Sequence, residues 1–163
     1  MITVDLVTEL RERFVLDWRG IHGAPHWARV RRNGLMPAKA TAANPRVIEA
    51  FAFLHDACRQ SEGHDPEHGP RAASQARELN GTLLQLTDAE QLLLTAACEG
   101  HSRNGAKAEA TIATCWDADR LDLGRVGIRP DPARLCTAPA KDYKLIEWAY
   151  YQSIRGQSIR GDA

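Results

Sequence analysis

The chain has 163 residues, of which 44% are hydrophobic and 26% carry a charge. This length suits one domain with a sizeable core, and the hydrophobic fraction excludes an intrinsically disordered protein. Lysine and arginine together number 21, as do aspartate and glutamate, so the formal net charge is zero. This balance argues against binding to extended nucleic acid or to an anionic membrane, because proteins that bind these polyanions usually carry an excess of basic residues.

Two further features bear on the cellular compartment. The N-terminal segment lacks the basic-then-apolar pattern of a signal peptide, and no apolar run approaches the ~20 residues that span a bilayer. The four cysteines are widely spaced and form no CxxC pair, so we expect reduced thiols that pack as small hydrophobic groups. The sequence therefore predicts a cytoplasmic protein without a membrane segment.

The first two helices are indicated by apolar periodicity and by breaker residues. Apolar residues from Val7 to Trp18 recur at helical spacing, and Gly20 closes this first helix. Pro25 opens a second helix, which the Asn-Gly pair at 33–34 is expected to end.

Later helices are marked by their caps. The Asn-Pro pair at 44–45 suits an N-cap and first turn, and the TDAE segment at 87–90 reads as a capping box. The remaining helices are expected at residues 46–59, 71–80, 87–99, 109–123 and 142–153. Because no run alternates apolar and polar residues between turns, the sequence predicts an all-α single domain over residues 1–152. A polar, frayed tail is expected at 153–163.

Two of these helices carry carboxylates where apolar side chains are expected. In the sixth helix, a projection at ~100° per residue puts Asp119 in the middle of the apolar arc, with Asp117 and Asp122 outside it or at its margin. The third helix has almost no polar face, so His55 and Asp56 should be buried too. Because isolated buried charges are costly, we expect a cation that binds these groups together.

His26 is a third polar group in a similar setting, since it lies at the start of the second helix and precedes Trp27. Two imidazoles and two carboxylates suit a borderline divalent metal such as manganese, iron, nickel, cobalt or zinc. Thiolates are absent from this set, which argues against a structural zinc site. Each side chain alone is also compatible with a structural role, as a satisfied core histidine, a helix cap or half of an ion pair.

In this order, the residues resemble the HD superfamily of metal-dependent phosphohydrolases. The matching pieces are HWARV with His26, FLHDA with His55 and Asp56, and CWDADRLDLGRVG with Asp119, and the resemblance covers about residues 20–128. It implies an HD-type helical bundle in which these four residues bind one divalent metal, with magnesium added to the metals named above. The last ligand is placed at the aspartate that directly precedes the arginine of the ADRL pattern and projects inward.

Some HD proteins carry additional histidines between the His-Asp pair and the final aspartate, which bind a second metal or the substrate phosphate. His68 and His101 match that arrangement. The GYP signature of the diguanylate-cleaving subgroup is absent, so cyclic-dinucleotide specificity is not expected. Whether His22, His64 or Asp117 joins the site stays open at this point.

The resemblance implies hydrolysis of a phosphate ester or anhydride in a small, nucleotide-like substrate by a metal-activated water. Asp56 would hold or deprotonate that water, while His68 and His101 would stabilise charge on the phosphate or protonate the leaving oxygen. Three basic residues that follow these histidines are candidate phosphate-binding groups: Arg71, Arg103 and Lys107.

Two other functions are alternatives. One is a non-catalytic, metal-stabilised ligand-binding module. The other is a di-iron oxygenase of the HD fold, for which His68 and His101 would supply the additional donors. The oligomeric state is also open, because the aromatic C-terminal helix suits either a dimer interface or closure of the core.

Overall fold

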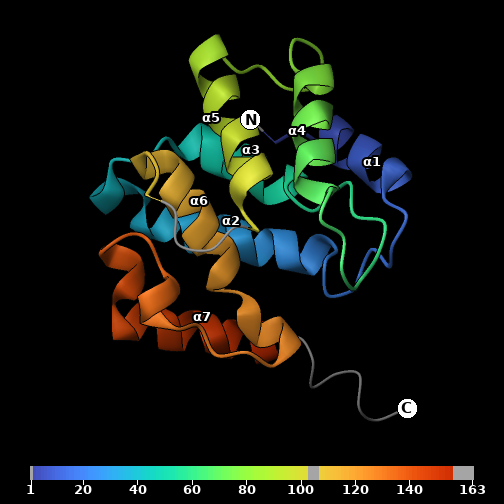
Figure 1. The fold of residues 1–163 in the computed structure, drawn as a ribbon. Coiled ribbons are helices and arrows are strands. Elements are labelled where there is room, and N and C mark those ends of the chain that lie inside the picture. Colours follow the sequence, from blue (N-terminus) through green and yellow to red (C-terminus); the bar gives the residue numbers. More distant parts are fainter. Residues whose placement is uncertain (1, 103–106, 156–163) are drawn as a thin grey trace, which may run out of the picture.

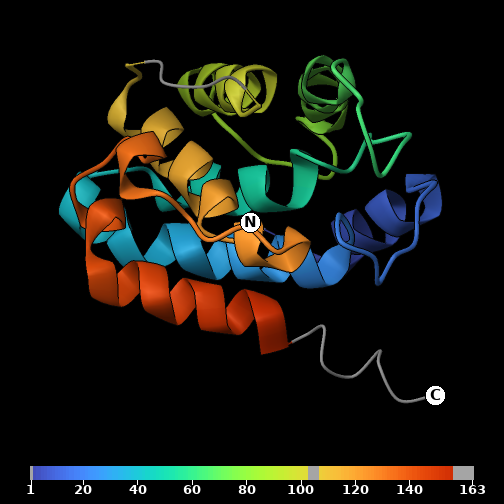
Figure 2. The ribbon, with the colours of Figure 1, turned by 60° about the horizontal axis from the view of Figure 1, so that its bottom comes forward.

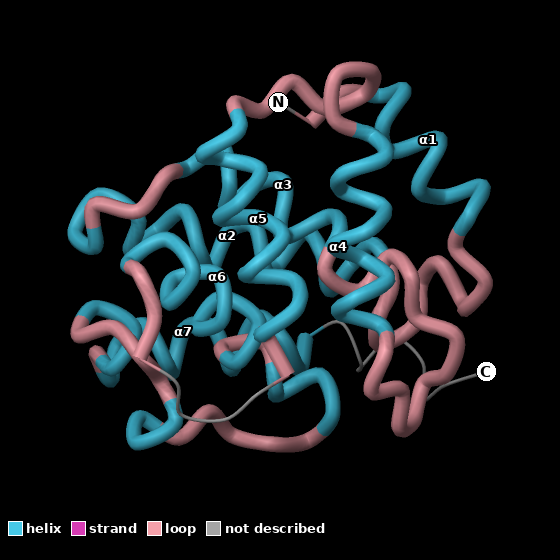
Figure 3. Tube along the Cα trace, turned by 45° about the horizontal axis from the view of Figure 1, so that its top comes forward, coloured by secondary structure: helices cyan, strands magenta, loops and turns pink. Residues whose placement is uncertain are grey.

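The structure is a computed structural model that describes residues 2–102 and 107–155. In these ranges the chain forms α-helices and short 3-10 helices without a β-strand (Figures 1 and 3). The α-helices are α1 (Val4–Arg13), α2 (Ala24–Thr41), α3 (Pro45–Leu54), α4 (His68–Leu79), α5 (Asp88–Gly100), α6 (Ala110–Arg120) and α7 (Tyr143–Arg155). The 3-10 helices are η1 (Leu123–Val126), η2 (Pro132–Arg134) and η3 (Pro139–Lys141). The predicted all-α, single-domain bundle is confirmed.

The helices stack in layers around α3. In Figure 2, α4 and α5 lie above α3 and α6, while α2 and then α7 lie below them. Helix α3 contacts α2, α4, α5 and α6, and α2 also packs against α6 and α7. The most apolar helix of the chain therefore lies at the centre of the bundle.

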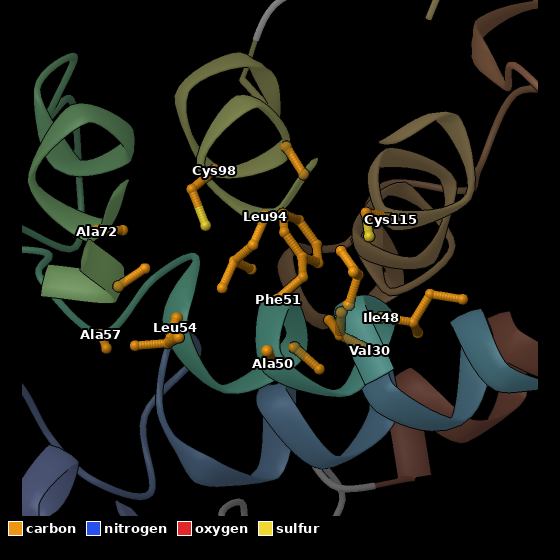
Figure 4. Packing of buried hydrophobic residues seen from close by; sticks show 14 of the residues in the cluster. Val30, Ile48, Ala50, Phe51, Leu54, Ala57, Ala72, Leu94, Cys98 and Cys115 are labelled. Carbon is orange, nitrogen blue, oxygen red and sulfur yellow. The ribbon is translucent and has the colours of Figure 1, made fainter. Parts of the chain in front are cut away.

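The core joins side chains from all the helices around α3. Val30, Phe51, Ala72, Leu94 and Cys115 come from five different helices and are fully buried in one cluster (Figure 4). Burying a large apolar side chain contributes about 1.5–3 kcal/mol, so this cluster fixes the relative positions of the helices. Polar side chains at the helix ends are held in place by this packing.

Helix α1 ends earlier than the periodicity predicts, at Arg13. The backbone of Phe14 is extended, and its ring packs edge-on against Trp18 at 6.0 Å and against Trp27 at 5.3 Å between ring centroids. The apolar residues that follow the helix, Phe14 and Trp18, therefore pack in an aromatic cluster from a loop. Their spacing indicated a helix that the backbone does not form there.

Helix α2 is longer than predicted and continues through Asn33, Gly34 and Pro37. The side-chain amide of Asn33 donates to the Ala118 carbonyl at 3.2 Å. Gly34 allows α3 to approach closely, because a Cβ atom there would lie 2.6 Å from Cγ2 of Ile48. The Asn-Gly pair is a packing contact here, and the prediction that it ends the helix is wrong.

The predicted caps at Asn44 and Thr87 are confirmed, the second as a complete capping box. Helix α3 nevertheless ends at Leu54, several residues before the predicted end. His55 and Asp56 therefore lie in the turn that follows the helix, so the directions of their side chains are not set by helical geometry.

Two boundaries differ in the other direction. Helix α4 begins at His68, three residues before the predicted start, and α7 continues to Arg155. Ser153, expected in the frayed tail, is buried within α7. The rest of that tail, residues 156–163, lies outside the described residues. Among the described helices, none has the length and apolar character that a membrane crossing requires.

Candidate metal centre

Six side chains that the sequence predicts for the site meet at the ends of five helices. Helix α2 supplies His26, the turn after α3 supplies His55 and Asp56, α4 begins with His68, the turn after α5 supplies His101, and the last turn of α6 supplies Asp119. Five of these residues are buried, and the side chain of Asp119 is 15% exposed. The helix bodies form the core while their ends bring the polar groups together.

The first group of donors is formed by His26, His55, Asp56 and Asp119. The Nε2 atom of His26 lies 3.1 Å from Nε2 of His55, 3.5 Å from Oδ2 of Asp56 and 3.4 Å from Oδ1 of Asp119. The His55 Nε2 atom lies 3.7 Å from the same Asp56 oxygen and 3.9 Å from the same Asp119 oxygen. Ligands bound at about 2.1 Å to one metal are separated by about 3.0–3.4 Å at octahedral or tetrahedral angles. His26, His55 and Asp56 therefore fit a single divalent cation with little movement, and Asp119 lies beside the two histidines.

A second group lies on the other side of Asp56. Its Oδ1 atom lies 3.4 Å from Nε2 of His68 and 3.7 Å from Nε2 of His101, and the two Nε2 atoms are 2.7 Å apart. Both groups have the spacing of metal ligands, the first through His26, His55 and Asp56 and the second through Asp56, His68 and His101. The two oxygens of one carboxylate thus face two positions that can hold metal ions.

Each of the four histidines donates a hydrogen bond through its outer ring nitrogen, Nδ1. The acceptors are the Asp122 carboxylate for His26 at 2.7 Å, the Phe51 carbonyl for His55 at 3.1 Å, the Asp65 carbonyl for His68 and the Cys98 carbonyl for His101 at 2.7 Å. This pattern fixes the tautomer in which Nε2 carries a lone pair, as in histidine ligands of metals. The Nε2 lone pairs of His26 and His55 face each other, as do those of His68 and His101, and they repel unless a cation or a proton lies between them. The arrangement of donors therefore favours binding of a positive charge.

Asp119 gives an independent indication. Its Oδ1 atom is buried and has no hydrogen-bond donor among the described residues. The nearest guanidinium nitrogen, Nη2 of Arg125, is 3.5 Å away. A buried carboxylate oxygen without a donor is costly, and a cation among the four donors would satisfy it.

The protonation states suit metal binding. Burial lowers the pKa of His55 to about 3, so its ring is neutral at pH 7. Burial would raise the pKa of Asp119, but Arg125 and the nearby histidines His55, His26 and His101 together outweigh it, and the pKa falls to about 2. Burial also opposes ionisation of Asp56, yet the surrounding histidines, His55 first, hold its pKa well below the usual value. Burial would lower the pKa of His101, but its interactions with Asp56, Asp119 and the Cys98 carbonyl together outweigh burial and raise the pKa. The first group thus presents anionic carboxylates, the form that binds a metal.

Asp122 is a site residue that the helical projection misplaced. It is fully buried, and besides the hydrogen bond from His26 it accepts hydrogen bonds from Nε and Nη2 of Arg29 at 2.6 and 3.0 Å. Helix α6 ends at Arg120, so a projection that continues the helix gives the wrong direction for this side chain. The available signal was its spacing of three residues from Asp119, which places both at the same helix end.

Asp117 lies away from both groups. Its carboxylate accepts hydrogen bonds from the backbone of Cys136 at 2.6 Å and from the backbone and hydroxyl of Thr137, each at 2.8 Å. The Nη1 atom of Arg120 lies 3.9 Å from Oδ1 of Asp117. The projection placed Asp117 outside the buried arc, but residues 136–137 cover that face of α6 and bury it completely.

The two remaining histidines are also outside the groups. Nδ1 of His22 pairs with Glu62, and its ring centroid is 6.4 Å from that of His26. His64 is exposed on the loop before α4.

The candidate phosphate-binding residues do not gather at the centre. Arg71 donates to both carboxylate oxygens of Asp65 at 2.8 and 2.6 Å and to the Cys58 carbonyl at 3.1 Å, so its guanidinium is already engaged. Lys107 is exposed and lines a separate pocket. Arg103 lies outside the described residues.

Arg59 is the basic residue closest to the second group, and sequence reasoning did not single it out. Its Nη1 atom lies 3.4 Å from Oδ1 of Asp56 and 3.2 Å from Nε2 of His68, and Nη2 donates to the Gly63 carbonyl at 2.8 Å. The sequence feature that could have identified Arg59 is its position three residues after Asp56, because the turn after α3 places the two side chains next to each other.

Comparison with known proteins adds no identification. No protein-family model matches the chain, and no curated protein or solved structure shows significant similarity to it. What is established is therefore a buried histidine and aspartate centre that can hold metal ions in an all-α fold.

Proposed function

We propose that this protein is a metal-dependent phosphohydrolase that acts on a phosphate ester or anhydride of a small, nucleotide-like substrate. The observation that carries the proposal is the Asp56 carboxylate, whose two oxygens face two groups of histidine donors. The resemblance of the ordered His, His-Asp and DADRLD segments to the HD superfamily supports the same chemistry.

The chemistry follows from the charges of the centre. A divalent cation supplies the charge that lowers the pKa of a water and polarises a phosphoryl oxygen. With a single metal bound by the first group, Oδ1 of Asp56 would hold the water through a hydrogen bond, because the low pKa of this carboxyl keeps it ionised at neutral pH. In that one-metal arrangement His101 would bind no metal; it lines a pocket beside the centre, and its raised pKa suits donation of a proton to the leaving oxygen.

A second candidate function rests on the same two groups. Two cation positions bridged by one carboxylate also suit a di-iron oxygenase of the HD fold. The third alternative, a non-catalytic metal-stabilised module, requires only the binding. Metal identity and metal number separate these functions from one another.

The test combines metal analysis with turnover. The purified chain is assayed for bound metal and, with each of the six candidate metals added, for phosphate release from nucleotides and generic phosphoesters. Replacing the shared carboxylate in Asp56→Asn should lower both metal content and hydrolysis by more than ~100-fold. Glu12→Gln, an exposed surface change without a hydrogen bond or ion pair to a described residue, is the matched control.

Each outcome assigns a function. Metal-dependent phosphate release that Asp56→Asn abolishes and Glu12→Gln preserves supports the proposal. Unchanged hydrolysis in Asp56→Asn refutes it. About two irons per chain with a mixed-valent signal favour the oxygenase, and metal-dependent stability without turnover favours the binding module.

A further inference from the structure

A pocket of ≈ 490 Å³ lies beside the metal centre, and it is lined there by His101 and Asp119. The pocket is also lined by residues between 123 and 135, among them the apolar side chains of Leu123, Ile128 and Leu135. Pockets of this size hold small organic ligands. A phosphate at the centre would therefore leave the organic part of its substrate against this apolar wall.

Three arginines line the same pocket, and two of them are already engaged. Arg120 donates through Nη1 to the Arg134 carbonyl at 3.2 Å. Arg129 pairs with Glu147 and lies over the ring of Tyr150, 5.0 Å from its centroid. Their positive charges are balanced inside the protein.

Arg134 differs from the other two. It ends η2 and is exposed, and its guanidinium forms no hydrogen bond or ion pair with the described residues. Asp131, the acidic side chain of the pocket wall, is turned to the backbone N–H of Ala133 at 2.9 Å and caps η2. The guanidinium of Arg134 is thus available to an anion in the pocket.

The backbone that carries this guanidinium is fixed next to the metal centre. The bond from Arg120, the residue after Asp119, holds the Arg134 carbonyl, and Leu135 is 4% exposed. A second pocket of ≈ 390 Å³ shares Arg134 and Leu135 with the first and contains Lys107. Arg134 therefore lines both pockets, the first of them together with His101 and Asp119.

We propose that the substrate carries a second anionic group, which pairs with Arg134 while its phosphate lies at the metal centre. The inference rests on the proposed function and deepens it. The ligand class is a small phosphate ester with an uncharged, apolar body and a carboxylate or phosphate at its far end. Arginine binds both groups through paired hydrogen bonds, and a neutral group of the same shape forms neither the pairs nor the charge contact.

The test uses aryl phosphates that differ only at the para position. The four compounds carry a carboxylate, a phosphate, a carboxamide or hydrogen there, and kcat/KM is measured for each with the metal-loaded protein. The wild-type protein should prefer the carboxylate or the phosphate over the carboxamide by about tenfold or more. Comparison of the two anionic compounds tells which anion the site accepts. Equal values for all four compounds would overturn the inference.

Variants of Arg134 test whether this residue causes the preference for anionic substrates. In Arg134→Gln the ratio of anionic to carboxamide substrate should fall to about one, and in Arg134→Lys part of it should return. Arg155→Gln, an exposed change at the end of α7, should keep the wild-type ratio. A preference that survives in Arg134→Gln would also overturn the inference.

Binding separates this inference from the proposed function. The affinities of the same four compounds are measured by calorimetry with wild-type protein and Arg134→Gln. An anion preference in binding without phosphate release keeps the Arg134 site and refutes the hydrolase. Phosphate release with no anion preference in rate or binding keeps the hydrolase and refutes the Arg134 site.

Discussion

Asp122 lies behind the metal centre and links His26 to Arg29. Its carboxylate sets the tautomer of the His26 ring and increases the basicity of Nε2. Asp122→Asn keeps the shape but removes the charge. We expect it to weaken binding of zinc or manganese by about 10–100-fold, measured by competition with a chelator of known affinity. An unchanged affinity would show that Asp122 has only a structural role.

Asp117 provides the matched comparison on the same helix. It is as deeply buried as Asp122, but its hydrogen bonds hold residues 136–137. Asp117→Asn should lower the free energy of unfolding by about 1–3 kcal/mol in urea denaturation, because it leaves buried N–H groups poorly satisfied. Its metal affinity should stay within a factor of about two of wild type. Equal losses of affinity in both variants would mean that the effect is general destabilisation.

The sequence predicted the donor residues of the candidate metal centre better than the residues that form hydrogen bonds with them. His55 and Asp56 were found because an apolar helix leaves polar residues no solvent-exposed face, and the structure buries both. Asp122 was misplaced because its direction depends on where α6 ends, which hydrophobic periodicity does not encode. Arg59 was missed because a single arginine after the His-Asp pair looks like surface charge until the turn after α3 is known.

At the scale of elements, the predicted ends were wrong where tertiary contacts override local signals. An Asn-Gly pair usually ends a helix, yet α2 continues through Asn33 and Gly34 because both contact neighbouring helices. The caps at Asn44 and Thr87 depend on local side-chain hydrogen bonds, and those predictions are confirmed. Helix caps that depend on local hydrogen bonds could therefore be predicted from the sequence, whereas helix ends that depend on packing between helices could not.

Substitution of Gly34 tests the contact between helices that carry candidate metal ligands. A Cβ atom there would lie 2.6 Å from Ile48 Cγ2 and 3.2 Å from Ala118 Cβ, so α3 and α6 must both shift. Gly34→Ala gains about 1 kcal/mol of helix propensity but overpacks the contact at a cost of about 1–3 kcal/mol. We expect a net loss of up to about 2 kcal/mol in urea unfolding, together with weaker metal binding.

The control for this change is Gly63→Ala. The nearest atom to a Cβ there is Ser61 Oγ at 3.6 Å, an ordinary contact. This variant should unfold within about 0.5 kcal/mol of wild type, as expected for a surface substitution. If Gly34→Ala were as stable as Gly63→Ala, α2 and α3 would not be closely packed at this point.

At the scale of the whole molecule, the centre joins donors that are up to 93 positions apart in the chain, from His26 to Asp119. The order of the motifs could be read from the sequence, but the distances depend on the packing of α2, α3, α4, α5 and α6. Packing also forces four histidine rings and two carboxylates out of water. The metal-free protein therefore carries a folding cost that depends on pH and on metal.

His55 determines how the stability of the metal-free protein changes with pH. Its pKa is about 3 in the folded protein, against about 6.5 for an unfolded histidine. Below pH 6.5 the unfolded chain binds a proton that the folded protein excludes, so the stabilisation from neutral His55 is complete above pH 6.5 and is lost as pH falls toward 3. Burial also lowers the pKa of His22 and His68, which adds to the loss, while the raised pKa of His101 offsets part of it.

We therefore expect metal-free protein to lose stability between pH 7 and pH 5, with about 2 kcal/mol of the loss due to His55 alone. Urea unfolding in the presence of a chelator measures it. His55→Gln should be less stable at pH 7 but should lose about 2 kcal/mol less on acidification, and His64→Gln, an exposed change, should behave as wild type. A wild-type loss equal to that of His55→Gln would mean that the His55 ring is protonated in the folded protein. Its Nε2 would then lack the lone pair that the proposed metal centre requires.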